Sequence, residues 1–438
     1  MRVHLRRAAV LAIGVSVALT SALGAPVHAA EADRVPARAG AAWLTGELTS
    51  GLMHNQEFDV DDYGLTIDAA LGLAEVGKER AVARIARAVA SHVPSYTTGA
   101  DFASSDVYAG ATAKAAVLAL VAGKDPERFG GVDLVAQLEG LVAESGRITD
   151  RSEFGDFSNV VGQAYAAWAL SSTSSKAARA VVGYLLQQQC AAGYFRLNFA
   201  ADPTAPDQTC DGAARRDRAA DTDATAIATL ALREVKVNAK VRRAIESSSA
   251  WLAKKQRDNG GFGGGTTTAK PNTNSTGLAG WVLRDLGYDE AAARAAAFVR
   301  SHQVQTVGRC TDELADEVGA IAYDARALRS GEAEGITEST RDQWRRAGAQ
   351  ALPVLTVAPE ADGRLAVSAR ATAERVQLRV TGVAPGERTC VTGAGSTEAL
   401  TAGWSGARVS LRLPGSGATT YRVTTAEGQT AKVVVDLR

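Results

Sequence analysis

Two stretches of the chain share one spacing of aromatic, Leu, Gln, Gly and Phe residues. The sequences are Trp251-Leu252-x3-Gln256-x3-Gly260-Gly261-Phe262 and Tyr184-Leu185-x3-Gln189-x3-Gly193-x-Phe195. Each predicts a helix that ends at a glycine turn, followed by a loop and a second helix behind a polar cap. Because the spacing recurs in register, the chain is expected to repeat a helix–turn–helix unit.

Weaker copies extend the array. They are Phe298-x4-Gln303 before Gly308, and Trp43-Leu44 before Gly51. The second helix of each unit is expected to open at a polar residue and to continue through Ala, Leu, Val and Gly. These openings are Asp62, Asp106, Asn159, Asp223, Ser275 and Asp316. Six openings at uneven intervals fit a closed ring better than a straight solenoid, whose repeat lengths would be more uniform.

The two kinds of helix differ in their apolar pattern. Before Gly260, Val241, Ile245 and Leu252 recur on one helix face, and basic residues occupy the other. The segment 224–232 is apolar nearly all round and should be buried on both sides. We therefore expect a mainly α protein, an (α/α)6 toroid over 41–351 with amphipathic helices outside and small-residue helices inside.

After Pro353 the apolar period changes from helical to alternating. Alternation is clear at 355–357, 365–369, 376–380, 409–413 and 433–435, with Pro- and Gly-containing turns between the runs. This pattern predicts a small antiparallel β-sandwich over 353–438, immunoglobulin-like in outline. No chemical motif occurs in it.

The compartment is predicted from the N-terminus and the cysteines. Residues 1–30 form a secretory signal pattern, with Arg6 and Arg7 before a short apolar run and small residues near the end. All four cysteines lie beyond it, as expected for disulfides in an exported protein. Cys190 and Cys210 bracket one loop, while Cys310 and Cys390 remain to tie the two domains. Zinc is disfavoured because no CxxC occurs, so no metal is expected.

Charge excludes some partner classes. Lys plus Arg and Asp plus Glu both number 48, so no net field attracts nucleic acid or anionic lipid. No apolar run is long enough to span a membrane. We expect a secreted monomer whose partner is a small molecule or a cell-surface ligand.

The Gln256–Gly264 turn and the helix pairs resemble the α/α-toroid superfamily. It includes squalene–hopene and class II diterpene cyclases, protein prenyltransferase β subunits, complement thioester domains and cobalamin carriers. The resemblance covers about 40–350 and implies a toroid fold. A thioester Cys-Gly-Glu-Gln run is absent, and no clustered Asp, Cys and His set suggests prenyltransferase zinc. The carriers share export, a disulfide-tied toroid and a following β domain, which implies a cobalamin-like ligand; no other cofactor is expected.

Asp59-Val60-Asp61-Asp62 matches the DxDD acid motif of class II terpene cyclases. The resemblance implies that Asp61 protonates an alkene, while Asp59 and Asp62 adjust its proton affinity. The alternative is a capping cluster, because acids are stabilised at a helix N-terminus. Aromatic residues make up only 5% of the chain, few for stabilising carbocations. We therefore favour the capping cluster.

If the inner helices are parallel, their caps meet at one mouth of the ring. The candidate ligand-binding residues there are Tyr63, Asp106, Tyr108, Asn159, Gln163, Asp221, Asp223, Asn274, Ser275, Asp316 and Glu317. Acidic and amide side chains of this kind suit a polar or cationic ligand. The sequence thus favours a non-catalytic binding module, with a cyclase that uses Asp61 as the alternative.

Overall fold

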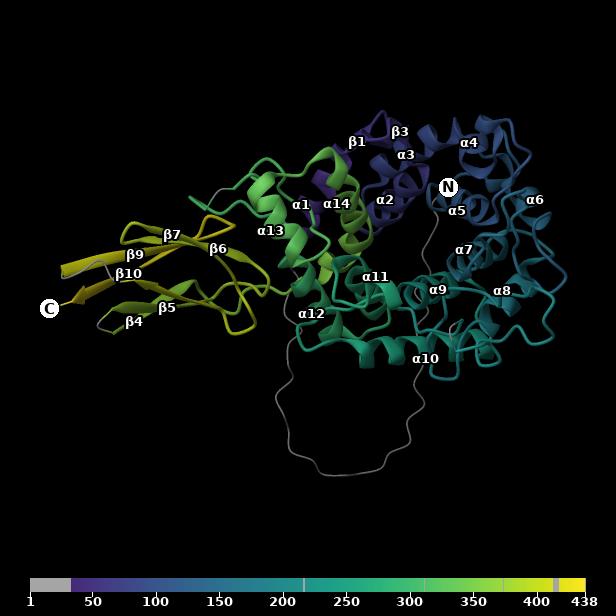
Figure 1. The fold of residues 1–438 in the computed structure, drawn as a ribbon. Helices are drawn as coiled ribbons and strands as arrows, with labels where there is room; N and C mark the ends of the chain where they lie inside the picture. Colours follow the sequence, from purple (N-terminus) through teal and green to yellow (C-terminus); the bar gives the residue numbers. More distant parts are fainter. Residues whose placement is uncertain (1–32, 216, 311, 373, 413–416, 438) are drawn as a thin grey trace, which may run out of the picture. The chain divides into compact units, whose positions relative to one another are not determined.

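The computed structural model describes residues 33–437 apart from 216, 311, 373 and 413–416. The predicted signal segment 1–30 lies outside the described residues. Figure 1 shows a helical part followed by strands. Helix α1 (Val35–Gly46) begins before the predicted start of the helical region, and the helical part ends with the 3₁₀ helix η4 (Leu352–Val357).

An inner set of helices forms a closed series of contacts. The set comprises α2 (Tyr63–Glu75), α5 (Ala109–Val121), α7 (Val160–Ser171), α9 (Thr222–Glu234), α11 (Thr273–Asp285) and α14 (Glu338–Ala351). Each contacts the next in this order, and α14 returns to α2 (Figure 1). The helical part is therefore a toroid. Ala is the most frequent residue in α5 and α7, which allows these two inner helices to pack closely on both sides.

Other helices cover this inner set. They are α1, α3 (Glu79–Ala90), α6 (Leu134–Glu139), α8 (Ala178–Gln187), α10 (Ala239–Lys255) and α12 (Asp289–Arg300). Helix α3 shows the reason: Val82, Ile85 and Val89 are buried, while its arginines take the other side. Short elements fill the connections. They are β1 (Leu48–Thr49), β2 (Leu52–Asn55), β3 (Val60–Asp61), α4 (Val93–Thr97), η1 (Ala100–Phe102), η2 (Pro126–Arg128), η3 (Thr266–Thr268) and α13 (Ala325–Glu334).

The helix starts agree with the sequence prediction only in part. Asp62 and Asn159 are N-caps as predicted, each accepting backbone N–H groups of its helix. Asp223 and Ser275 lie inside the first turn, because Asp221 and Asn272 are the actual caps. Asp106 precedes α5, whose N-cap is Tyr108.

The predicted opening at Asp316 is wrong. This residue is exposed in a series of turns, and the last inner helix, α14, begins at Glu338. The apolar residues 320–322 after Asp316 misled the prediction. They are buried because Ile321 pairs with Gln303 in an isolated β-bridge, not because they form a helix.

The repeated Gln and Gly residues join neighbouring repeats. The Nε2 of Gln256 donates to the carbonyl of Gly260 at 3.0 Å and to that of Ala291 in α12 at 2.8 Å. Gly260 has φ +84°, and a Cβ there would lie 2.3 Å from the Arg294 carbonyl oxygen. A side chain would therefore separate the turn from α12. One amide thus closes its own turn and holds the next outer helix.

The same joint recurs at other positions. Gln189 donates to Gly193 and to Ala244 of α10, both at 2.9 Å. Gln303 donates to Pro36 of α1 at 2.9 Å and to Gly319 at 3.2 Å. Gly319, not the predicted Gly308, is therefore the turn glycine of that repeat. Because Pro36 belongs to the first helix, this last joint closes the ring.

The C-terminal part forms two antiparallel sheets. One has the order β10-β9-β6-β7 and the other β4-β5-β8. The strands are β4 (Ala366–Ala371), β5 (Arg375–Thr381), β6 (Arg388–Gly393), β7 (Ser396–Thr401), β8 (Ala407–Arg412), β9 (Gly417–Thr425) and β10 (Thr430–Leu437). Buried residues of both sheets, including Val376, Leu378, Tyr421 and Val423, share one core. The predicted strand at 355–357 is instead part of η4, and β6, β7 and β9 were not identified from the sequence.

Both expected disulfides are present. Cys190 pairs with Cys210, and Cys310 pairs with Cys390. The second bond joins the helical part to β6. Beside it, Arg388 forms ion pairs with Asp312 at 3.3 Å and with Glu332 at 2.6 Å. The disulfides fit an oxidising compartment.

Replacing Gln256 with Ala should destabilise the toroid. The change removes both donated hydrogen bonds and leaves Arg294, which donates to Oε1 at 2.8 Å, without this partner. We expect a loss of about 2 kcal/mol in the free energy of unfolding, measured by urea denaturation. Exposed Gln343 on α14 is the matched control, and Gln343→Ala should change stability by less than about 0.5 kcal/mol. Equal effects of the two changes would contradict the joint.

Candidate functional site

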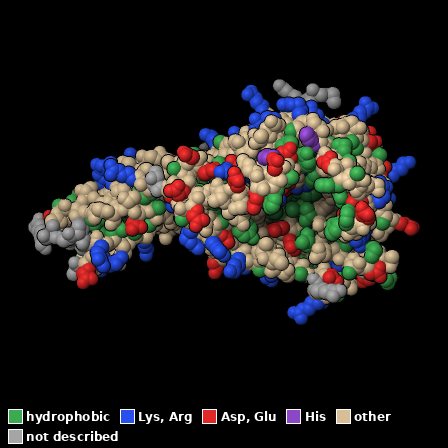
Figure 2. Space-filling model, turned by 45° about the horizontal axis from the view of Figure 1, so that its top comes forward, with side chains coloured by type: hydrophobic (Ala, Val, Ile, Leu, Met, Phe, Trp, Pro, Cys, Tyr) green, Lys and Arg blue, Asp and Glu red, His purple; other side chains and the backbone are tan. Residues whose placement is uncertain are grey.

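A cavity of about 480 Å³ lies among the inner helices. The N-terminal turns of α2, α5 and α7 border it, as expected if these helices share one direction. Figure 2 shows a hollow in the helical part with hydrophobic side chains in its depth. The lining is mixed in character and consists of Asp68, Tyr96, Tyr108, Gly110, Ala111, Lys114, Asp150, Phe157, Ser158, Asn159, Val161, Gly162, Tyr165, Ile227 and Gln350.

An ion pair sits in the wall of this cavity. Lys114 Nζ lies 2.7 Å from Asp68 Oδ1 and donates to the Gly64 carbonyl at 2.9 Å. The two side chains are only 15% and 16% exposed, so the pair is largely removed from solvent. The ammonium also lies 5.9 Å from the Tyr165 ring centroid. Such a pair offers a ligand both a fixed cation and a fixed carboxylate.

Tyrosines surround this pair. Burial, followed by the charge of Asp68, raises the pKa of both Tyr96 and Tyr165 well above the usual value. Burial also raises the pKa of Tyr108, and the neighbouring Asp106 carboxylate adds to the shift. The three phenols therefore remain protonated at neutral pH. Tyr96 and Tyr165 can donate hydrogen bonds to a ligand, whereas the Tyr108 hydroxyl already donates to Asp106 at 3.3 Å. All three offer aromatic faces.

A smaller apolar space of about 70 Å³ adjoins the cavity, because Tyr165 and Ile227 line both. Its remaining lining is Leu71, Glu75, Trp168, Leu230, Ala231, Arg233, Glu234, Leu278 and Trp281. Arg284 binds Glu75 and Asp285, and Asp285 also binds Arg233. These ion pairs tie together the C-terminal ends of α2, α9 and α11. The interior thus has a larger chamber of mixed lining and a smaller, mainly apolar one.

A buried carboxyl group lies in the first turn of α9. Asp223 Oδ1 is inaccessible to solvent and has no hydrogen-bond partner, although the rest of the side chain is partly exposed. Burial raises the pKa of Asp223 to about 6; the neighbouring Ser275 hydroxyl opposes this shift, and the Asp221 carboxylate reinforces it. Nearby, Asn274 donates to Gln350 of the cavity at 2.8 Å. Asp223 therefore keeps its proton up to about pH 6.

The DxDD segment is not part of the cavity lining. Asp61 lies in β3 and contacts His54 Nδ1 at 3.0 Å, and Asp59 is almost fully exposed, 3.3 Å from Nε2 of the same ring. Asp62 caps α2 and pairs with Arg346 at 2.6 Å. Of the three acids, only Asp62 acts as the predicted helix cap.

The predicted rim residues separate into several groups. Tyr108 and Asn159 line the cavity, and the ring of Tyr63 contacts that of Tyr96. Burial acts to raise the pKa of Asp106. Hydrogen bonds that it accepts from the Ser152 hydroxyl and the Glu153 N–H outweigh this effect, so the pKa lies below the usual value. These groups lie near α4, α5 and α7.

Other predicted residues have structural contacts or lie elsewhere. Gln163 is fully buried and donates to the Gly146 and Val181 carbonyls, so its amide joins repeats. Glu317 accepts from Trp43 at 2.7 Å and pairs with Arg341 at 2.8 Å, beside α1 and α14. Asp316 is exposed and is absent from the cavity lining.

Several lining residues were missed by the sequence analysis, above all Asp68 and Lys114. A signal existed: each is a charged residue within an otherwise apolar helix, at Ile67-Asp68-Ala69 and Ala113-Lys114-Ala115. Such a charge is expected to be paired or functional. Gln350 gave no signal, because α14 had not been assigned to the inner set.

Two further findings concern the described residues only. Within them, no group of three or more His, Cys, Asp or Glu side chains is arranged to hold a metal ion. No helix in the same residues has the length and apolarity needed to cross a membrane.

The comparisons with known proteins support the fold. No known protein family and no curated protein matches the sequence. A variant of the type II terpene cyclase MstE from Scytonema, without ligand, is 15% identical with a TM-score of 0.51, covering 73% of this chain and 95% of its own. A protein from Actinoplanes is 18% identical, covers 74% and 98% of the two chains and has a TM-score of 0.48. A glycosidase is 14% identical, with coverages of 74% and 97% and a TM-score of 0.45. At 15% identity, the likeness to MstE shows the fold alone.

Replacing Asp223 with Asn should alter the pH dependence of stability. The folded-state pKa is raised, so the stabilising contribution of Asp223 is present below about pH 4 and is lost as pH rises through about 6. Relative to wild type, Asp223→Asn should therefore gain on the order of 2 kcal/mol between pH 4 and pH 7.5. Urea denaturation at both pH values measures this. Exposed Asp316→Asn is the control, and parallel behaviour of the two variants would contradict a raised pKa at Asp223.

Proposed function

We propose that the toroid binds a small molecule in its central cavity without transforming it. The observation that carries this proposal is the 480 Å³ cavity, with the Asp68–Lys114 ion pair and three tyrosines in its wall. This volume is typical of small-molecule sites, which combine apolar and aromatic walls with a few placed polar groups. The mixed lining of the cavity suits an amphipathic ligand with its polar end toward Lys114.

The proposal also includes the number of helix pairs in the toroid and the type of the β-sandwich. We infer an (α/α)6 toroid, since the cycle of inner helices contains six members. The sheet orders β10-β9-β6-β7 and β4-β5-β8 support an immunoglobulin-like sandwich. We also propose that the protein is exported and monomeric. The two disulfides support export. A cobalamin-like compound stays among the candidate ligands.

The alternative is a class II terpene cyclase with Asp61 as the acid. The toroid fold shared with MstE favours it, but the position of Asp61 does not. A general acid must come within hydrogen-bond reach of the atom that it protonates. Asp61 contacts His54 and is absent from both chambers. Geometry therefore favours binding over cyclisation.

Filling the cavity should abolish binding. Ile227 lies at the junction of the two chambers, so Ile227→Trp should obstruct both. The probe is 8-anilinonaphthalene-1-sulfonate, an amphipathic anion, followed by fluorescence titration. We expect at least a tenfold loss of affinity, the size of about 1.4 kcal/mol. Val237→Trp adds the same side chain at an exposed position and should leave binding unchanged. Equal affinities of the two variants would contradict ligand entry into the cavity. Titration with cyanocobalamin uses the same pair of variants.

Asp61→Asn distinguishes binder from cyclase. Wild type and variant are incubated with squalene and with geranylgeranyl diphosphate, and extracts are analysed by mass spectrometry. We expect no cyclised product from either protein, and a stability change of no more than about 1 kcal/mol. A product from the wild type that disappears in Asp61→Asn would overturn the non-catalytic function, because only the transferable proton is lost.

A further inference from the structure

One sheet of the sandwich carries a concentration of positive charge. Strands β4, β5 and β8 contain five arginines and no Asp or Glu. All five are exposed and alternate with the core residues, so they share the outer face of the sheet. We call this surface the arginine face; its arginines are Arg370, Arg375, Arg379, Arg408 and Arg412. This local positive charge is not apparent from the formal net charge of the chain, which is zero.

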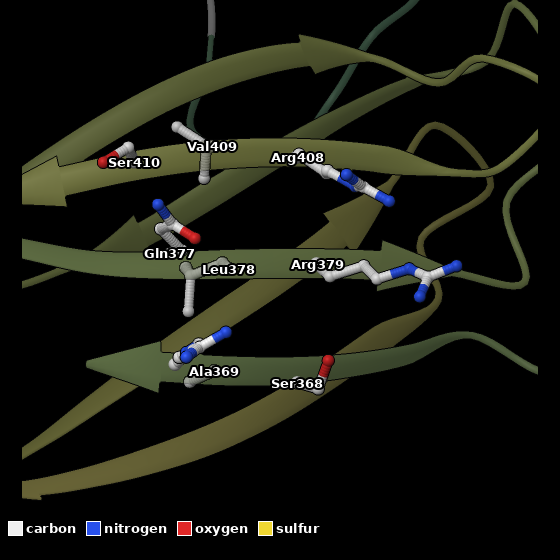
Figure 3. A pocket seen from close by; sticks show the side chains of 9 residues that line it. Ser368, Ala369, Gln377, Leu378, Arg379, Arg408, Val409 and Ser410 are labelled. Carbon is white, nitrogen blue, oxygen red and sulfur yellow. The ribbon is translucent and has the colours of Figure 1, made fainter. Parts of the chain in front are cut away.

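The strand register places like charges directly opposite one another. Arg379 pairs with Arg408, and Arg375 with Arg412, across the β5–β8 ladder. Such cross-strand pairs repel and destabilise a sheet. In Figure 3, the labelled side chains of Arg379 and Arg408 lie side by side and point the same way. An anion bound between them would remove the repulsion.

No acidic side chain neutralises this face among the described residues, because none of the five arginines forms an ion pair there. Arg375 instead donates to the Ser410 hydroxyl and carbonyl, both at 2.8 Å. Arg388, on the other sheet, differs because Asp312 and Glu332 neutralise it. The other four guanidinium groups of the arginine face thus remain available to an external anion.

The face is hollow and carries neutral donors beside the charges. A depression of about 630 Å³ is lined by Arg370, Arg379 and Arg408 together with Ser368, Ala369, Gln377, Leu378, Val409 and Ser410 (Figure 3). Successive outward residues of a strand are about 7 Å apart, so the donors form rows across the sheet. Rows of this kind match an extended chain with repeated charges better than one small anion.

We propose that the arginine face binds a linear phosphodiester polymer that lacks bases, such as a polyol phosphate chain. Arginine suits phosphate because its planar fork donates two parallel hydrogen bonds to the oxygens. Binding of single-stranded nucleic acid uses aromatic side chains for stacking, and the lining contains none. A membrane surface favours protruding Trp, Phe or Leu side chains, whereas Leu378 in this lining is buried.

The test measures binding of fluorescently labelled poly(glycerol phosphate) to the full chain by anisotropy. The variant Arg379→Thr/Arg408→Thr removes one opposed pair and introduces a residue that favours strands. We expect its affinity to fall at least tenfold. We also expect its salt dependence, log K against log salt, to lose a slope of about 1.4, from two phosphate contacts. Its melting temperature should be unchanged or higher, because the repulsion is removed.

A matched control comes from the other sheet. Arg422 and Lys432 also pair across strands, β9 with β10, and both are exposed. Arg422→Thr/Lys432→Thr removes the same charge and should keep polymer affinity within about twofold, because this site lies outside the depression.

Three results would overturn the proposal. They are an equal loss of affinity in both double variants, no binding by the wild type at low salt, and tighter binding of oligo(dT) or of vesicles with anionic phosphatidylglycerol than of the polymer. Loss of binding confined to Arg379→Thr/Arg408→Thr, with oligo(dT) and vesicles weaker, supports it.

Discussion

Three joints between repeats of the helical part each depend on the amide of one glutamine. Each such glutamine donates to its own turn glycine and to an outer helix of the next repeat, as Gln189, Gln256 and Gln303 do. The last of these contacts spans 267 residues. It connects the final turn to α1. The kind of hydrogen bond that links successive repeats therefore also closes the ring. Closure of the ring places the inner helices around one central space.

Small residues then determine how narrow that space becomes. A Cβ on Gly72 would lie 2.3 Å from the Ala349 carbonyl oxygen of α14, and one on Gly277 would lie 2.3 Å from the Ala351 Cα. Helices that approach this closely leave room for few large side chains in the centre. The large side chains that line the interior are therefore few and include Tyr96, Tyr165 and Trp168. The charges of Asp68 and Lys114 can lie there because the two side chains form an ion pair with each other.

The sequence predicted the features that depend on local spacing. The Gln-x3-Gly turn, the small-residue helices, the later alternation and both cysteine pairs predicted a helical toroid with a sheet domain and two disulfides. It failed where tertiary contacts decide. The segment after Asp316 resembles a helix start, yet Ile321 pairs with Gln303, and the inner position belongs to polar α14. Asp68 and Lys114 were missed because their proximity depends on which inner helices are neighbours.

The same limit applies to motifs. Asp59-Val60-Asp61-Asp62 matches an acid motif in sequence, but a turn and a short strand direct two of its carboxylates toward His54. Conversely, no short motif identifies the arginine face, since its residues come from three strands and only register brings them together. A sequence pattern therefore predicts a functional site only when the residues of that site lie on one helix or strand. Where several elements contribute, as at the cavity and the arginine face, the packing and pairing of those elements must be known first. The Cys310–Cys390 bond is an example, because it joins residues 80 apart in sequence and links the helical part to β6 a second time, beside the chain itself.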